Sequence, residues 1–250
     1  MDLLSRHAKY KQRSYETSRD RHIPELRSRP DEPSVVLLGD SMIERMITTG
    51  LSPSFLPWPS ASMVSDDVIA QHNNSASGPA LHRLEGVFNA GVGGDKIENL
   101  VYRLVGSTDV DRPLDSLLDL LRQRKVRVWV LHVGTNNLHP KRGLKEKHLD
   151  LLRLVVGALL EAGGRVLLVG LFRRRDVGDD LVGEATEGYR RIAREFEARE
   201  SGRVEFVEPS EVEMDRCLED HVHLNEEGYR VWGEMLMKRV LAAVDDSRAS

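Results

Sequence analysis

The residues best suited to chemistry are a serine, a histidine and an aspartate that follow predicted strands. Ser41 comes two residues after the aliphatic run 35–38 and the glycine that ends it. Asp220 and His223 lie three residues apart in a predicted loop. A serine nucleophile, an imidazole base and a carboxylate that orients the imidazole are the parts of serine-dependent acyl transfer. These residue types therefore predict serine hydrolysis, if the fold brings them together.

Two further segments contain groups that could stabilise the oxyanion of such a reaction. Residues 89–95 read Asn-Ala-Gly-Val-Gly-Gly-Asp, and residues 134–137 read Gly-Thr-Asn-Asn. Glycine lets backbone N–H groups approach a substrate oxygen, and an asparagine amide can donate to it. Both segments could instead be simple tight turns. The glycine spacing is not the G-x-G-x-x-G of a dinucleotide site.

The elements that must position these groups alternate between strand and helix. Aliphatic runs predict strands at 35–39, 86–89, 126–133, 165–171 and 204–207. Apolar stripes predict helices after Ser41, from 97, and over about 113–125, 144–162, 183–200 and 226–241. This alternation predicts a parallel sheet of about five strands, covered on both faces, with ligands at the carboxyl ends of the strands. Ser41 at that edge could alternatively be only the N-cap of its helix.

Two segments do not fit the alternation. Residues 1–33 are highly charged and contain three prolines, which predicts an N-terminal extension with at most a short helix. Residues 51–82 are rich in Pro and Ser, which predicts a surface insertion with one helical turn near 66–71. Its large apolar residues are either core contacts or a wall of the substrate pocket: Phe55, Leu56 and Trp58.

Composition narrows the class of protein. The 250 residues carry a net charge of -4, which predicts no global attraction to nucleic acid or anionic membranes. The single cysteine, Cys217, can form neither an internal disulfide nor a Cys-based zinc site. His221 and His223 could be a metal pair, but no third ligand has a convincing spacing, so we expect no metal and no cofactor.

The sequence also indicates where the protein is located and how one basic cluster is neutralised. Residues 1–30 lack the apolar core of a signal peptide, and no run approaches the length of a membrane span, so we expect a cytoplasmic protein without an integral membrane segment. Three arginines at 173–175 are followed at once by aspartates. This pattern favours a solvated, locally neutralised loop.

Four short blocks, in order, resemble the SGNH (GDSL-type) hydrolases over about residues 34–241. They are Gly39-Asp40-Ser41, residues 89–95, residues 134–137 and Asp220-x-x-His223. The second and third blocks are most similar to those of intracellular platelet-activating factor acetylhydrolase catalytic subunits. The resemblance implies a hydrolase domain at 34–245 with a flavodoxin-like three-layer α/β/α fold. It also implies ester hydrolysis without a metal.

Carried over to this chain, the resemblance implies a role for each site residue. Ser41 would be the nucleophile, His223 the general base and acid, and Asp220 the residue that orients the imidazole. The oxyanion hole would consist of the backbone N–H groups of Ser41 and Gly94 and the side-chain amide of Asn136.

The function implied is a serine esterase that cleaves a small or short-chain, acetyl-type ester through an acyl-enzyme. The alternatives are a lysophospholipase or thioesterase acting on longer acyl chains and a noncatalytic binding protein on the same fold. Met42 replaces the usual leucine, the 51–82 insertion is long, and residues 171–174 replace a stretch that usually contains proline. The last two departures could alter the pocket rim. The expected partner is a small-molecule or lipid ester, and the related subunits pair, which allows a homodimer.

Overall fold

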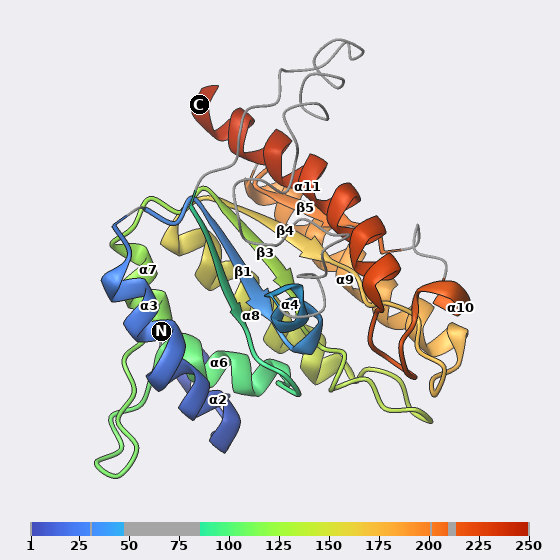
Figure 1. Ribbon diagram of the computed structural model, residues 1–250, viewed down its shortest axis with the longest axis horizontal. Coiled ribbons are helices and arrows are strands. Elements are labelled where there is room, and N and C mark those ends of the chain that lie inside the picture. Colours follow the sequence, from blue (N-terminus) through green and yellow to red (C-terminus); the bar gives the residue numbers. More distant parts are fainter. Residues whose placement is uncertain (1, 31, 48–85, 201, 210–213, 250) are drawn as a thin grey trace.

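Five parallel strands form the central sheet of the computed structural model, in the order β2-β1-β3-β4-β5 (Figure 1). They are β1 (Val35–Gly39), β2 (Val87–Gly91), β3 (Val128–His132), β4 (Arg165–Val169) and β5 (Val204–Val207). The structure describes residues 2–30, 32–47, 86–200, 202–209 and 214–249. The predicted insertion at 51–82, including its apolar residues and its helical turn, lies outside the described residues.

The three central strands, β1, β3 and β4, contain runs of aliphatic residues that are buried on both faces. Every residue of β1, β2 and β3 is buried, as expected for a parallel sheet with helices on each side. In the register of the sheet, Gly39 lies opposite Gly91 on β2 and His132 on β3. The carboxyl ends of these three strands are therefore level, and the segments that follow them start at one edge.

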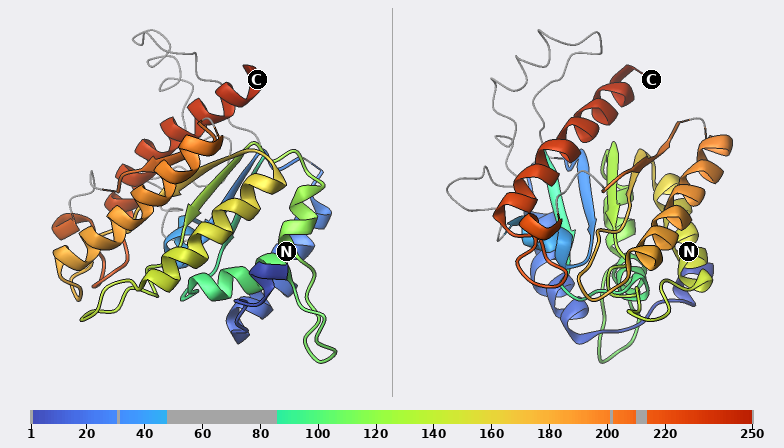
Figure 2. Two further views of the ribbon diagram at one scale, coloured as in Figure 1. Left: turned by 180° about the vertical axis from the view of Figure 1, so that it is seen from behind. Right: turned by 90° about the vertical axis from the view of Figure 1, so that its right-hand side faces the viewer.

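Helices cover both faces and complete a three-layer sandwich, which confirms the predicted fold class. One face carries α6 (Ile97–Val105), α7 (Leu117–Arg122), α8 (Glu146–Ala162) and α9 (Asp179–Glu200). The other carries α4 (Ser41–Glu44), α10 (Met214–Cys217) and the long α11 (Glu226–Ala249). The view along the sheet in Figure 2 shows α11 and α9 on opposite sides of the strands. The strand order is that of the flavodoxin-like fold. In this fold, ligands bind at the carboxyl ends of the neighbouring strands β1 and β3, from which the chain continues to opposite faces of the sheet.

Two helical predictions differ from the structure. The helix expected over 113–125 is limited to α7, because the Ser116 side chain accepts a hydrogen bond from the Asp119 N–H (3.0 Å) and caps it there. The expectation of at most a short helix in the N-terminal extension is wrong. Its helices are α1 (Asp2–Ser5), α2 (Gln12–Thr17) and α3 (Ile23–Ser28), with the π-helical turn η1 (Ser18–His22) joining the last two. Pro24 lies in the first turn of α3, where a missing N–H is tolerated.

This N-terminal segment packs against the chain that leaves β2. The Lys9 N–H donates to the carbonyl oxygen of Glu98 (3.0 Å), and the Arg21 Nη2 donates to that of Gly91 (3.1 Å). Ser14 donates its hydroxyl to the Asp95 carboxylate. The segment thus lies beside the loop that follows β2, at the carboxyl edge of the sheet. Among the described helices, none is both long and apolar enough to cross a membrane.

Candidate active site

Ser41, His223 and Asp220 form one hydrogen-bonded chain at the carboxyl edge of the sheet. The distance from Ser41 Oγ to His223 Nε2 is 3.0 Å, and the distance from His223 Nδ1 to Asp220 Oδ2 is 2.7 Å. Ser41 is the first residue of α4, and its N-cap is Asp40, whose side chain accepts from the Met42 N–H. The alternative that Ser41 is only an N-cap is therefore wrong. Its hydroxyl faces the imidazole instead.

Asp220 is held as a carboxylate by the loop that carries it. Its Oδ1 accepts hydrogen bonds from the backbone N–H groups of Val222 and His223, both at 2.7 Å. Burial opposes ionisation, but these bonds and the one to the His223 ring outweigh it and lower the pKa of Asp220 well below its usual range. Asp220 therefore presents a fixed negative charge to the imidazole at neutral pH.

Gly94 and Asn136 face the same space as the serine. They line a cavity of about 490 Å³ together with Ser41 and His223. Gly94 has a φ of +75°, a conformation that favours glycine. The Asn136 amide donates to the carbonyl oxygen of Asp95 (2.9 Å), which uses one of its two N–H bonds and fixes its plane. All five residues predicted from the sequence are thus brought to one site.

Buried polar residues hold the strand ends that carry these groups. The Asn89 Nδ2 donates to the carbonyl oxygen of Ile43 (2.8 Å), which ties β2 to α4. The Arg103 side chain is 0% exposed; its Nε donates to Asp95 Oδ2 (2.8 Å) and its Nη1 to the carbonyl oxygen of Ala90 (2.8 Å). Nothing in the sequence position of Arg103 distinguishes it from a surface arginine, so its burial could not be predicted from the sequence.

Besides the predicted site residues and Gly93 of the glycine segment, six residues line the cavity: Arg13, Glu44, Arg45, Arg174, His221 and Val222. Of these, the sequence predicted only that the stretch 171–174 could alter the pocket rim. Arg13 was missed because it belongs to the N-terminal extension. Arg174 does pair with Asp176, at 2.6 Å, as a locally neutralised loop requires. It is not solvated, however, because its side chain is only 11% exposed and reaches the cavity.

Asp40 directly precedes the nucleophile in the chain and is completely buried. Burial raises the pKa of its carboxyl to about 7, against a hydrogen bond from the Met42 N–H that lowers it. Because its Oδ1 caps α4, the carboxyl group fixes the start of the helix on which Ser41 lies.

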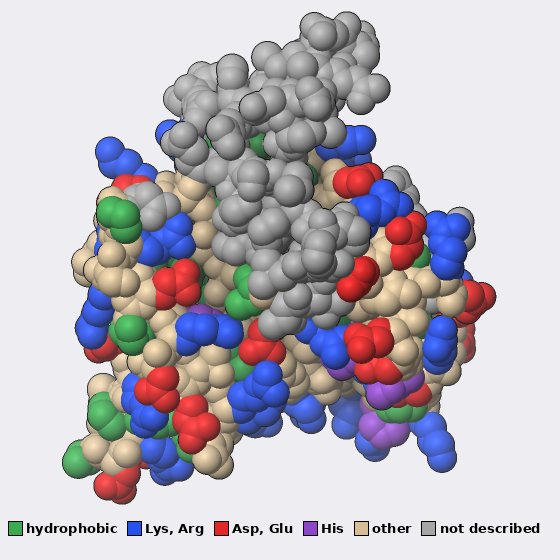
Figure 3. Space-filling model, in the orientation of Figure 1, with side chains coloured by type: hydrophobic (Ala, Val, Ile, Leu, Met, Phe, Trp, Pro, Cys, Tyr) green, Lys and Arg blue, Asp and Glu red, His purple; other side chains and the backbone are tan. Residues whose placement is uncertain are grey.

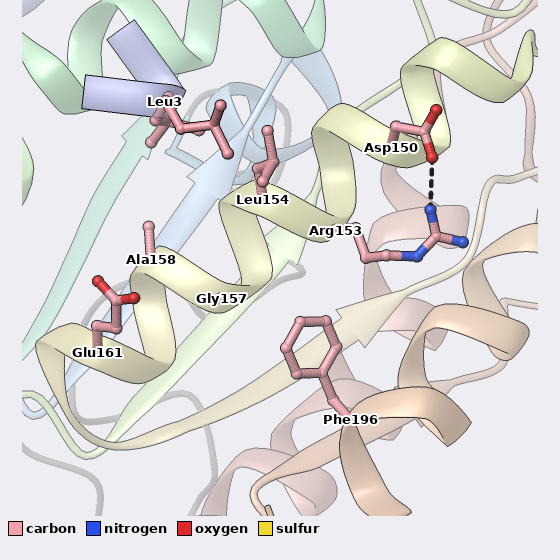
Figure 4. Close-up of a pocket in the computed structure, with 9 residues that line it drawn as sticks. Leu3, Asp150, Arg153, Leu154, Gly157, Ala158, Glu161 and Phe196 are labelled. Atoms are coloured by element: carbon pink, nitrogen blue, oxygen red, sulfur yellow. Dashed lines mark hydrogen bonds and ion pairs between the residues drawn. The ribbon is translucent and has the colours of Figure 1, made fainter. Parts of the chain in front are cut away.

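A second cavity, of about 480 Å³, lies on the far side of α8 from the sheet (Figure 4). Its described lining comes from α1, α8 and α9 and includes Leu3, Leu154 and Phe196, with the Asp150–Arg153 ion pair at one end. No serine, threonine, cysteine or histidine is among its described lining residues. Within the described chain, no group of three or more His, Cys, Asp or Glu residues is placed to hold a metal ion.

Comparison with known proteins identifies the family. The sequence profile of the GDSL-like lipase/acylhydrolase family matches residues 37–231. The chain belongs to this family. It is accordingly a carboxylic ester hydrolase, as the sequence predicted. No curated protein sequence matches the chain.

Solved structures share the family fold at low sequence identity. A candidate platelet activating factor protein from Streptococcus pneumoniae is 16% identical, with a TM-score of 0.58 over 90% of this chain and 92% of the other. A GDSL-like lipase from Bacteroides thetaiotaomicron is 14% identical, with a TM-score of 0.58 over 91% and 97%. The acetyl xylan esterase AlAXEase is 19% identical, with a TM-score of 0.54 over 82% and 98%. At these identities the likeness establishes the fold alone.

Proposed function

We propose that this chain is a serine esterase that hydrolyses small or short-chain acyl esters through an acyl-enzyme on Ser41. The observation that carries the proposal is the chain of hydrogen bonds from Asp220 through His223 to Ser41, at 2.7 and 3.0 Å, which ends in the 490 Å³ cavity. A nucleophile within hydrogen-bond reach of a base that a carboxylate orients is the arrangement that acyl transfer requires.

In the first half of the reaction, Ser41 Oγ attacks the ester carbonyl carbon and gives its proton to His223 Nε2. The carboxylate of Asp220 stabilises the imidazolium that forms. The carbonyl oxygen becomes an oxyanion, which accepts from the N–H groups of Ser41 and Gly94 and the amide of Asn136. Ser41 opens a helix, so its N–H lies in the first turn, where helix N–H groups have no intrahelical acceptor.

Acylation ends when the tetrahedral intermediate collapses to the acyl-enzyme and the alcohol leaves with the proton from His223 Nε2. A water molecule then gives a proton to the same nitrogen and attacks the acyl carbon on Ser41. Collapse of the second intermediate releases the carboxylic acid and returns the proton to Ser41. The net reaction is hydrolysis of one ester bond by one water.

The character of the cavity favours a small acyl group over a long chain. Among the described residues that line it, Val222 is the single aliphatic side chain. A long acyl chain needs an extended apolar wall to leave water. The described part of the wall around Ser41 is made mostly of arginine, glutamate, asparagine and histidine side chains, surroundings that suit a small acyl group better than a long apolar chain.

The test is hydrolysis of p-nitrophenyl esters from acetate to palmitate by the wild-type protein and by Ser41→Ala. We expect the highest kcat/KM for acetate to butyrate, a steep decline for longer chains, and no turnover above background in the variant. A maximum at long chains would replace the short-chain assignment with a lipase-type one. Equal rates for the two proteins would overturn the proposal.

A further inference from the structure

The described lining of the cavity around Ser41 is rich in arginine, and each of these arginines pairs with a carboxylate. It contains three arginines and one glutamate: Arg13, Arg45, Arg174 and Glu44. The carboxylates that pair with Arg45 and Arg174 lie outside this lining. Figure 3 shows Lys and Arg side chains gathered along the edge of the molecule where the strands of Figure 1 end, with His side chains beside them. Hydrolysis of a neutral ester does not itself require these arginines.

Arg174 supplies a fixed guanidinium, paired with Asp176, on the side of the cavity that carries Asn136. Its Nη1 donates to the carbonyl oxygen of Thr135 (2.7 Å), the residue before Asn136. Its Nε and Nη2 donate to the two carboxylate oxygens of Asp176, at 2.8 and 2.6 Å. These bonds hold the guanidinium in one orientation, so little side-chain entropy is lost when it meets a ligand.

Arg13 supplies a more accessible cation on the side of the glycine loop. Its side chain is 60% exposed, and its Nη2 donates to Glu44 Oε2 at 2.8 Å. The guanidinium lies against Gly93, where an added Cβ would be 2.9 Å from Nη2 and 2.6 Å from Glu44 Oε2. Glycine at this position is therefore what lets the ion pair rest on the loop. The bond to Glu44 leaves most of the guanidinium N–H groups of Arg13 available to a ligand.

We propose that the substrates of this esterase carry an anionic group, a carboxylate or a phosphate, which Arg13 binds at the mouth of the cavity, while Arg174 presents a fixed guanidinium, paired with Asp176, on the opposite side. This inference rests on the proposed function, because it names the substrate class of the same site. Guanidinium groups suit both anions, since they offer paired N–H donors to two oxygens. Arg13 precedes the region that matches the family profile, so this specificity comes from the N-terminal segment.

The test compares acetyl esters that differ in charge at matched size. One pair is 3-acetoxypropanoate and 3-acetoxypropanamide; the other is 2-acetoxyethyl phosphate and its neutral dimethyl phosphotriester. Release of acetate gives kcat/KM for each. We expect the anionic member of at least one pair to be favoured about tenfold or more at low ionic strength, and less at high salt. The favoured pair distinguishes carboxylate from phosphate.

Arg13→Gln and Arg27→Gln form a matched set, because each removes one positive charge from the N-terminal segment. Arg27 is an exposed residue of α3 that pairs with Asp115 at 2.7 Å and does not line the cavity. We expect Arg13→Gln to lower the anionic-to-neutral ratio about tenfold and Arg27→Gln to leave it unchanged. Arg13→Lys keeps the charge but not the paired donors, and is expected to keep part of the preference, which separates loss of charge from loss of fold. Equal ratios in the wild-type protein, or equal effects of the two Gln variants, would overturn the inference.

Calorimetric titration of Ser41→Ala with the two anionic esters judges the anion site without turnover. If these esters bind and the added Arg13→Gln substitution weakens binding about tenfold, the inference is supported, whether or not the esters are hydrolysed. Binding without any hydrolysis by the wild-type protein would overturn the proposed function alone. Ser41-dependent hydrolysis without charge preference, together with no binding of either anion, would overturn the inference and leave the esterase standing.

Discussion

At Asn136, the two amide hydrogens have different tasks. One is bonded to the carbonyl oxygen of Asp95, and the proposal assigns the other to the oxyanion. The next residue, Asn137, has a different role: its Oδ1 accepts from the Ile97 N–H (2.9 Å) and its Nδ2 donates to Glu98 (2.8 Å), at the start of α6. In the proposed mechanism, the two adjacent asparagines therefore have different roles, Asn136 as an oxyanion donor and Asn137 as a structural residue.

We predict that Asn136→Ala lowers kcat for p-nitrophenyl acetate about 100- to 1,000-fold, the usual effect of removing one oxyanion donor. Its matched control, Asn137→Ala, should lower the melting temperature and leave kcat within a few fold of the wild-type value. Steady-state kinetics and thermal unfolding of both variants check this. A larger loss of kcat in Asn137→Ala would contradict the assigned roles.

Asp40 makes stability depend on pH in a direction unusual for an aspartate. Its pKa rises from the ordinary 3.8 to about 7 on folding, because the carboxyl is buried. The native state therefore binds its proton more tightly than the unfolded state, and the stability that this provides is complete below about pH 4 and lost as the pH rises through 7. Asp40→Asn keeps a good N-cap and removes the titration.

We predict that the unfolding free energy of the wild-type protein, relative to Asp40→Asn, falls by up to a few kcal/mol between pH 4.5 and pH 8. Urea unfolding of both proteins at the two pH values measures it, and the difference between them removes the titration of the other groups. A difference that is constant with pH, or that grows in favour of the wild type, would refute it.

Most elements of the fold were predictable, because β1, β3 and β4 contain runs of buried aliphatic residues and the long helices that cover the sheet have apolar stripes. The short helix α7 was overestimated since its length depends on one cap, at Ser116. The helices at 12–28 were missed because tertiary contacts stabilise them. Ser14 reaches Asp95 and Arg21 reaches Gly91, 81 and 70 residues away, and no local pattern encodes such contacts.

The residues of the site likewise divide into those that the sequence predicted and those that it did not. Ser41, Gly94, Asn136, Asp220 and His223 were predicted from four short blocks at strand and helix ends. Arg13 was not, because its place in the cavity depends on how a separate segment packs. For Arg174 the sequence predicted only that the stretch 171–174 could alter the pocket rim.

Arg103 joins several of these elements, and its removal tests that role. It links α6 to the ends of β1 and β2, with bonds to Gly39, Ala90 and Asp95. Arg103→Leu would leave the buried Asp95 carboxylate without this partner, so we predict a loss of about 3–5 kcal/mol in the free energy of unfolding. Arg112→Gln, which breaks an exposed pair with Asp109, should cost less than about 1 kcal/mol. Similar costs in urea unfolding would contradict the role of Arg103.

At the scale of the whole molecule, parallel strands bring distant segments to one edge of the sheet. Ser41 and His223 are 182 residues apart in the chain, yet Ser41 Oγ lies 3.0 Å from His223 Nε2. The N-terminal segment, outside the residues that match the family profile, adds Arg13 to the same cavity. Four points stay predictions: the division into an N-terminal extension at 1–33 and a hydrolase domain from 34, the homodimer, the cytoplasmic location, and the lack of nucleic-acid binding.

The most direct test of the account is to map the residue that a fluorophosphonate labels, since this reagent reacts with an activated serine and mimics the tetrahedral intermediate. Intact-mass and peptide analysis of the wild-type protein should find one adduct, on Ser41. His223→Ala should lose nearly all labelling under the same conditions, because the hydroxyl then has no base. An adduct on another serine, or undiminished labelling of His223→Ala, would contradict the claim that Ser41, His223 and Asp220 act together as the catalytic centre.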